Sequence, residues 1–249
     1  MLLVANAGSS GTPRPFVPSL IQGLVLDLDG DLGVTVVDGL VTAWADQSGA
    51  GDPNRDAVAT SDTQNPTLSA TDPDFNGHSA IQFDATSNEQ MVSVGDWSDA
   101  PVAAPLTIVI VGEDDNQAAV LRGYLANFLG GANWWFSNGG TPDRWEMFAG
   151  TVLASAMHAD TNPNIYYLEV NNPSTSMRIS EQTPDKVGDM GGGALSISRL
   201  RIGALSAAPG SGLTGKIARI LVYSRLLTTV ERLNLLAYCS TLYAIALGA

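Results

Sequence analysis

The chain has 249 residues and carries 25 acidic against 12 basic side chains, which gives a formal net charge of −13 at pH 7. A protein that binds nucleic acid needs clustered Lys and Arg to displace counterions from phosphate. Because the sequence shows no such cluster, nucleic acid is not expected as a partner. No window of about 18 apolar residues is present, so insertion into a membrane is not expected either.

Turn-forming residues are frequent along the whole chain. The sequence contains 26 Gly and 13 Pro, with Asn, Asp, Ser and Thr between short apolar runs. This composition indicates many turns and few helices, which favours an all-β sandwich or barrel. A compact chain of this length buries about 70 to 75 per cent of its unfolded surface, so one large core is available. We therefore expect a single all-β domain over residues 22–249.

Residues 1–21 form a segment rich in Gly, Ser and Pro. Its prolines keep the chain extended and are unsuited to a sheet interior. The segment is therefore predicted to be an extended arm that tethers the protein in an assembly. The residues expected to make its contacts are Pro13, Arg14, Pro15 and Phe16.

Short apolar runs between turn residues predict the strands that follow the arm. In chain order, strands are expected at 24–28, 34–37, 40–45, 79–84, 90–94, 106–112, 120–128, 133–137, 144–149, 152–157, 164–170, 176–180, 195–203 and 216–223. No repeat of 20 to 50 residues stands out, so nothing indicates a repeat architecture.

The end of the chain is one strand followed directly by one helix. Almost every residue of 216–223 is apolar or favours strands, as in a strand covered on both faces. Thr228 and Glu231 have the spacing of a capping box, which predicts that a helix begins there and runs over 228–246. Apolar residues at helical spacing, Cys239 among them, predict that one side of this helix packs on the sheet.

Four segments resemble a known family. They read LVLDLDGD at 24–31, VTAWADQSGAGD at 41–52, FNGHSAIQFDATSNEQMV at 75–92 and GKIARILVYSRLLTTVE at 215–231. These motifs resemble the laminin-G-like, concanavalin A-like jelly-roll domains of phage structural proteins and bacterial surface proteins. Arg219 departs from the pattern, which usually has an acid there.

The resemblance implies a jelly-roll β-sandwich over almost the whole chain. It also implies a non-enzymatic structural module of a virion, in capsid decoration or a tail. The single cysteine, Cys239, cannot form an internal disulfide, which favours assembly in the reducing cytoplasm of the host. The expected partners are other virion proteins and further copies of this chain. This sandwich also carries lectins and glycan hydrolases, so a carbohydrate-binding module that recognises host surface glycan is the alternative, and a glycan-cleaving enzyme is the least favoured function.

The carboxylates do not have the spacing of a glycan hydrolase. Such enzymes use two carboxylates about 5 to 10 Å apart, which this sandwich usually supplies from one strand with the pattern E-x-D-x-x-E. No glutamate of this chain stands in that pattern, and the acidic run 113–115 is interpreted as a solvated turn. His78 and His158 lie in no metal or nucleophile motif. No catalytic residue is therefore assigned.

Asp27, Asp29 and Asp31 are the candidate ligands for calcium, because alternate oxygens could converge on a hard cation. The spacing does not fit an EF-hand, since the sixth position is Leu32 and the twelfth is Asp38. A strand that ends in a turn at Gly30 is the alternative interpretation. The resemblance allows calcium, since many laminin-G-like domains bind one at the sandwich rim, and no other cofactor is expected.

Trp134, Trp135 and Trp145 are the candidate ligand-binding residues, because flat aromatic rings stack on sugars and are common at interfaces. Successive residues of a strand point to opposite faces. At least one of Trp134 and Trp135 is therefore expected in the core, which leaves the other for a ligand or a neighbouring subunit.

Overall fold

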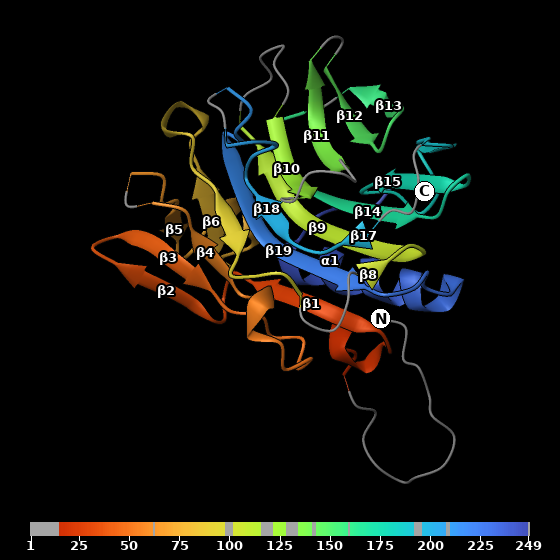
Figure 1. The fold of residues 1–249 in the computed structure, drawn as a ribbon. Helices are drawn as coiled ribbons and strands as arrows, with labels where there is room; N and C mark the ends of the chain where they lie inside the picture. Colours follow the sequence, from red (N-terminus) through yellow and green to blue (C-terminus); the bar gives the residue numbers. More distant parts are fainter. Residues whose placement is uncertain are drawn as a thin grey trace, which may run out of the picture.

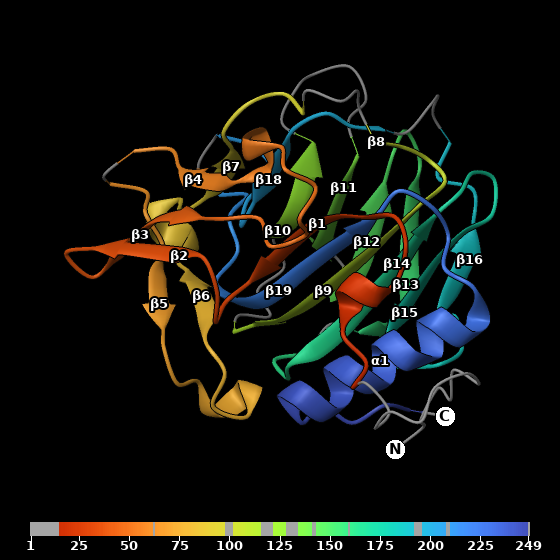
Figure 2. The ribbon, with the colours of Figure 1, turned by 90° about the horizontal axis from the view of Figure 1, so that it is seen from below.

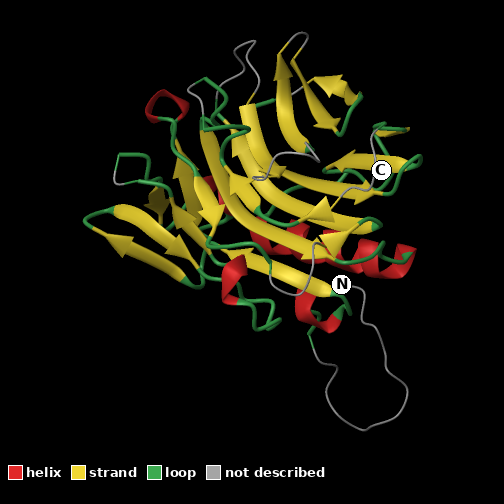
Figure 3. Ribbon diagram, viewed as in Figure 1, coloured by secondary structure: helices red, strands yellow, loops and turns green. Residues whose placement is uncertain are grey.

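The computed structural model describes residues 15–61, 63–97, 102–115, 122–127, 134–140, 143–158, 160–191, 196–207 and 210–248. This part of the chain is almost entirely strands and loops, with one α-helix, α1 (Thr229–Tyr243), near its end (Figures 1 and 3). The predicted all-β jelly roll with one C-terminal helix is confirmed.

The first sheet lies next to the helix and is antiparallel throughout. In spatial order its strands are β1 (Leu24–Asp29), β19 (Gly215–Tyr223), β9 (Leu106–Asp114), β14 (Asn164–Val170), β15 (Thr175–Ile179) and β16 (Lys186–Gly188). Its two longest strands, β9 and β19, have nine residues each and bring together parts of the chain that are about a hundred residues apart.

The second sheet faces the first and is also antiparallel. In spatial order its strands are β13 (Val152–His158), β12 (Asp143–Phe148), β11 (Trp135–Gly140), β10 (Arg122–Asn127), β18 (Leu200–Ile202), β7 (Met91–Ser93), β4 (Ala57–Ala59), β3 (Leu40–Trp44) and β2 (Val34–Val37). The remaining elements are β5 (Thr67–Ser69), β6 (Ala80–Phe83), a ribbon of β8 (Val102–Ala103) and β17 (Ser196–Ile197), and 3-10 helices at Pro18–Leu20, Pro53–Arg55, Pro73–Phe75 and Ala85–Ser87. Because β5 pairs with β3 and β6 with β19, the two sheets are joined along one side.

The alternation of residues in the first sheet builds two cores. Ile108 and Ile110 of β9 face the second sheet, while Val109 and Val111 face α1. The same alternation holds in β14 and β19, which explains why the last strand is apolar at nearly every position. Figure 2 shows α1 lying along the first sheet. The residues that α1 buries there are Leu235, Leu236, Cys239 and Tyr243.

Every predicted strand has a counterpart, although the run 195–203 divides into β17 and β18. The sequence missed β4, β5, β8 and β16, because runs of two or three residues are too short to show a periodicity. The capping box of Thr228 and Glu231 is confirmed. The helix ends at Tyr243 rather than at 246, because Ala244 takes a left-handed conformation with φ of 54°.

The segment before β1 packs on the fold from Phe16 onward. The ring of Phe16 meets that of Tyr238 on α1 with centroids 5.8 Å apart, and Pro18 and Ile21 are buried. The hydroxyl of Tyr223 donates to the Pro18 carbonyl at 3.3 Å. Residues 16–21, which the sequence assigned to the arm, therefore belong to the packed domain.

Pro15 is exposed, and Pro13 and Arg14 lie outside the described residues. Within the described part of the chain, no helix combines the length and the apolar composition that a membrane crossing requires.

Candidate functional site

The three predicted tryptophans have different environments. Trp145 is completely buried between the sheets, with ring centroids 4.6 Å from Tyr166 and 5.5 Å from Tyr124. Trp134 is also buried, and its Nε1 donates to the carbonyl of Ser196 at 3.2 Å. The prediction that these two contact a ligand is wrong, because their rings are core residues. Only Trp135 is partly exposed.

Strand register places the side chain of Trp135 on the outer face of the second sheet. In the β11–β12 hairpin Trp135 pairs with Phe148, and Ser137 pairs with Glu146. Phe136 and Trp145 occupy the alternate positions and pack in the core, so the paired residues point outward. We call the surface formed by Trp135, Glu146 and Phe148, with Ser137 at its floor, the β11–β12 face.

The aromatic part of this face is an offset stack. The rings of Trp135 and Phe148 have centroids 5.2 Å apart and an interplanar angle of 13°. Both side chains are half-buried, and the neighbouring Val152 on β13, which pairs with Phe148, is 46% exposed. A stacked pair of this kind is fixed in orientation before any ligand arrives, so little side-chain entropy is lost on binding.

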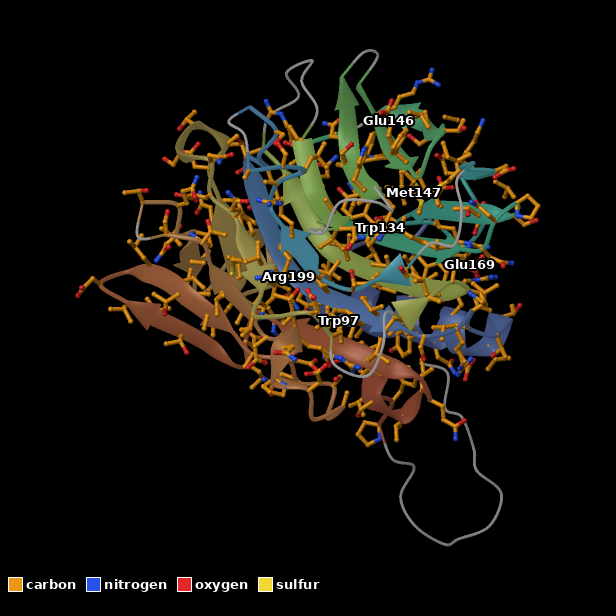
Figure 4. All side chains as sticks on the ribbon, in the orientation of Figure 1. Trp97, Trp134, Glu146, Met147, Glu169 and Arg199 are labelled. Carbon is orange, nitrogen blue, oxygen red and sulfur yellow. The ribbon has the colours of Figure 1, made fainter. Side chains whose placement is uncertain are left out.

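The polar part of the face is Glu146, which Figure 4 labels. It lies two residues before Phe148 on β12 and pairs with Ser137. Its carboxylate is half-buried, and in the part of the chain that the structure describes it has no hydrogen bond or ion pair. Burial raises the pKa of Glu146 above its ordinary value. A methyl group on Gly139 would collide with this carboxyl group, so glycine at that position leaves room for Glu146. The Oγ of buried Ser137 below it also lacks a hydrogen-bond partner.

Among the described residues of the β11–β12 face, Glu146 is the one carboxylate. The pKa of Glu146 is shifted by burial alone, with no charged neighbour contributing. A glycan hydrolase would need a second carboxylate about 5 to 10 Å away. The face therefore supplies a flat apolar surface and one hydrogen-bond acceptor, which is the chemistry of recognition.

The candidate calcium ligands Asp27 and Asp29 have another partner. Both carboxylates are buried against Arg219, whose Nε and Nη2 donate to Asp27 at 2.9 and 2.8 Å and whose Nη1 lies 3.0 Å from Asp29. The hydroxyl of Tyr238 accepts from Arg219 at 3.2 Å. A guanidinium thus stands between the two carboxylates, where a cation would have to bind.

Asp31, the third candidate, lies in a separate contact. It accepts from the backbone N–H of Ser79 at 2.7 Å and meets Nδ1 of His78 at 2.6 Å. Burial alone would raise the pKa of Asp31, but these hydrogen bonds outweigh it and lower the pKa below its ordinary value. Among the described residues, no group of three or more His, Cys, Asp and Glu side chains is placed to hold a metal ion.

Sequence reasoning missed Phe148 and Glu146 as site residues. The signal that identifies them is the hairpin register, which sets Phe148 opposite Trp135 and Glu146 next to this pair.

The sequence also contained the signal for the Arg219 ion pair. An arginine in a strand that is buried on both faces needs buried carboxylates as partners, and the strand beside it contains Asp27 and Asp29.

No protein-family model matches the chain, and no curated protein matches it. Solved structures do resemble it. Domain 4 of a GH43 extracellular arabinanase from Geobacillus stearothermophilus, in complex with arabinotriose, has a TM-score of 0.59 at 11% identity, over 86% of this chain and 98% of that chain. The binding domain of botulinum neurotoxin DC in complex with SialylT has a TM-score of 0.57 at 7% identity, over 87% and 51%.

A sialidase of Trypanosoma rangeli, in complex with the inhibitor DANA, has a TM-score of 0.57 at 16% identity. The match covers 89% of this chain and 34% of the sialidase, so the chain spans about a third of that protein's length. At these identities the likeness shows the fold alone: the chain shares the jelly-roll-like β-sandwich of these domains.

Proposed function

We propose that the chain is a non-enzymatic carbohydrate-binding module and that the β11–β12 face holds a sugar ring. The observation that carries this proposal is the partly exposed stack of Trp135 and Phe148 beside the carboxylate of Glu146, which has no hydrogen bond or ion pair among the described residues. A sugar ring has one apolar face of C–H groups and hydroxyl groups around its rim. An aromatic side chain packs against such a face, while Glu146 accepts hydrogen bonds from the hydroxyls.

The similar structures support this proposal as analogy. The arabinanase domain and the neurotoxin domain were solved with arabinotriose and SialylT, and both share the sandwich of this chain. Fold likeness does not assign a function, so the proposal depends on the residues of the β11–β12 face. The non-enzymatic part of the proposal depends on the carboxylates, because burial raises the pKa of Glu146 and no second described carboxylate contributes to the shift.

The test is a glycan array that contains neutral and sialylated oligosaccharides, followed by calorimetry with each oligosaccharide that binds. We expect binding with Kd in the micromolar to millimolar range, and a loss of about tenfold or more in affinity for Trp135→Ala and for Phe148→Ala. Phe16→Ala is the matched control, because Phe16 is a partly buried aromatic residue on the α1 side of the molecule.

Two results would contradict the proposal. The first is the absence of binding to any oligosaccharide by the folded wild-type protein. The second is an equal loss of affinity in Phe16→Ala and Trp135→Ala, because a specific site on the β11–β12 face cannot respond to a change on the opposite side. Incubation of bound oligosaccharides with the protein should leave them uncleaved, which chromatography of the reaction mixture checks.

The structural role in a virion stays a prediction of the sequence resemblance, as do the virion partners and location. The two roles are compatible, because a glycan-binding module can serve a particle that attaches to a host surface.

A further inference from the structure

Strand β2 is an open edge of the second sheet. Among the residues that the structure describes, it pairs with β3 alone, and the β2–β3 hairpin projects from the body of the molecule (Figure 1). Thr35, Val36 and Val37 are exposed, the two valines by 42% and 52%. Leu32, just before the strand, is 54% exposed. The edge is thus apolar as well as unpaired.

β2 lacks the charges and prolines that protect many edge strands, although it has only four residues and its pairing with β3 has a register shift between Thr35 and Val36. Natural edge strands carry Lys, Pro or inward-pointing charges, or a loop covers them, because unpaired N–H and C=O groups invite another strand. Residues 32–37 read LGVTVV and contain neither a charge nor a proline. This run consists mainly of β-branched residues, which favour strand pairing.

The outer edge of β1 shows the contrast within the same protein. Arg55 Nη1 donates to the carbonyl of Val25, and Trp44 Nε1 donates to that of Asp29, both at 2.8 Å. The backbone N–H of Gln47 donates to the carbonyl of Asp27 at 2.8 Å. The fold therefore satisfies the outward backbone groups of one edge strand with loops and side chains, and leaves β2 exposed.

We propose that β2 is a docking surface for a second copy of this chain, through antiparallel pairing of the two β2 strands. Antiparallel pairing of a strand with itself has two-fold symmetry, so the same surface serves both copies. With a net charge of −13, two copies repel each other, and the run 32–37 brings no charged side chain into the contact, although Asp31 and Asp38 flank it. In a two-fold pairing centred on Val36, Asp38 lies opposite Val34, so no two acidic side chains face each other.

The expected dimer is weak and depends on concentration. A stable interface buries about 1,200 to 2,000 Å². Pairing over a strand of four residues with its exposed valines buries a smaller area than this.

The dimer would nevertheless extend the second sheet continuously across both copies. A two-fold axis perpendicular to that sheet would turn both outer faces to the same side. The pairing does not depend on the proposed function, but it would let two β11–β12 faces bind one glycan surface together.

The first test is the mass in solution by light scattering, at concentrations from about 1 µM to about 1 mM. The wild-type mass should rise from 26.0 kDa toward twice that value, and Val36→Lys should stay near 26.0 kDa at every concentration. Val230→Lys is the matched control, because this valine on α1 is 61% exposed, and it should dimerise like the wild type. Circular dichroism should show that both variants are folded.

A wild-type mass that stays at that of the monomer overturns the proposal. Equal dimerisation of Val36→Lys and the wild type also overturns it, and so does an equal loss in Val230→Lys. A chain that lacks residues 1–14 should still dimerise, since a loss there would assign assembly to the N-terminal segment instead. As a second measurement, Val36→Cys should form a disulfide-linked dimer on mild oxidation, and Val230→Cys should not.

Discussion

The ion pair of Arg219 with Asp27 and Asp29 supports a quantitative prediction. The three residues are each at most 7% exposed, and the arginine meets Asp27 with two hydrogen bonds. Arg219→Met keeps the apolar stem and removes the positive charge, which leaves two buried carboxylates without a cation. Breaking a buried pair in this way costs about 3 to 5 kcal/mol of unfolding free energy. With a urea m value of about 3 kcal/mol/M, the unfolding midpoint falls by about 1 to 1.7 M at pH 7.

The loss should depend on pH in a defined direction. Burial raises the pKa of Asp27 even with Arg219 in place, and removing Arg219 takes away the hydrogen bonds and the charge that lower it. A carboxyl group whose folded pKa is raised stabilises the fold below its unfolded pKa of about 3.9 and loses that contribution as pH rises through the folded pKa. The difference between Arg219→Met and the wild type should therefore be largest at pH 7 and shrink toward pH 4.

Urea unfolding followed by tryptophan fluorescence at pH 7 and pH 4 measures both quantities. Lys186→Met, at an exposed position of β16, is the control and should change the unfolding free energy by less than about 0.5 kcal/mol. A variant that combines Arg219→Met with Asp27→Asn and Asp29→Asn should recover part of the stability, because the uncompensated charges are gone. The reasoning is refuted if Arg219→Met costs less than about 1 kcal/mol at pH 7, or if its cost grows as pH falls.

Three further outcomes are expected. Trp145→Ala should lower the unfolding free energy by about 3 to 5 kcal/mol, because it opens a cavity between the sheets, and calorimetric melting measures this. Gly139→Ala should weaken oligosaccharide binding in calorimetry, since its methyl group displaces the Glu146 carboxyl group. The hydrogen bonds from Arg225 lower the pKa of Glu231 to about 2, so its contribution is present above the unfolded pKa and lost as pH falls toward 2. Glu231→Gln should therefore be less stable than the wild type at pH 7 and similar to it near pH 2.

Local signals predicted most of the fold. The capping box of Thr228 and Glu231 is a contact between neighbours in sequence. The apolar residues at nearly every position of 216–223 indicate that this strand is covered on both faces. Such features depend on few residues and appear directly in the sequence. The short strands β4, β5, β8 and β16 depend on pairing with distant partners instead, so no local period indicates them.

The site could be predicted only in part, because it depends on register. Shifting a strand by one residue exchanges its core face and its solvent face. From the sequence alone, Trp134, Trp135 and Trp145 were equal candidates for ligand binding. Pairing in the β11–β12 hairpin buries Trp145 and leaves Trp135 partly exposed. The same pairing brings Phe148 to Trp135 from across the turn. Sequence reasoning stated the alternation correctly but had no means of fixing the register.

The position of the site follows from the layers of the fold. α1 and the segment around Phe16 cover the outward face of the first sheet, so that face is occupied by the chain's own helix. The second sheet contributes its inner face to the core and presents Trp135, Glu146 and Phe148 outward at β11 and β12. Alternate residues of β11 and β12 therefore either pack in the core or point outward, where the proposed ligand would bind. Trp145 and Glu146, adjacent on β12, illustrate this division: one is fully buried between the sheets and the other is a half-buried carboxylate open to a ligand.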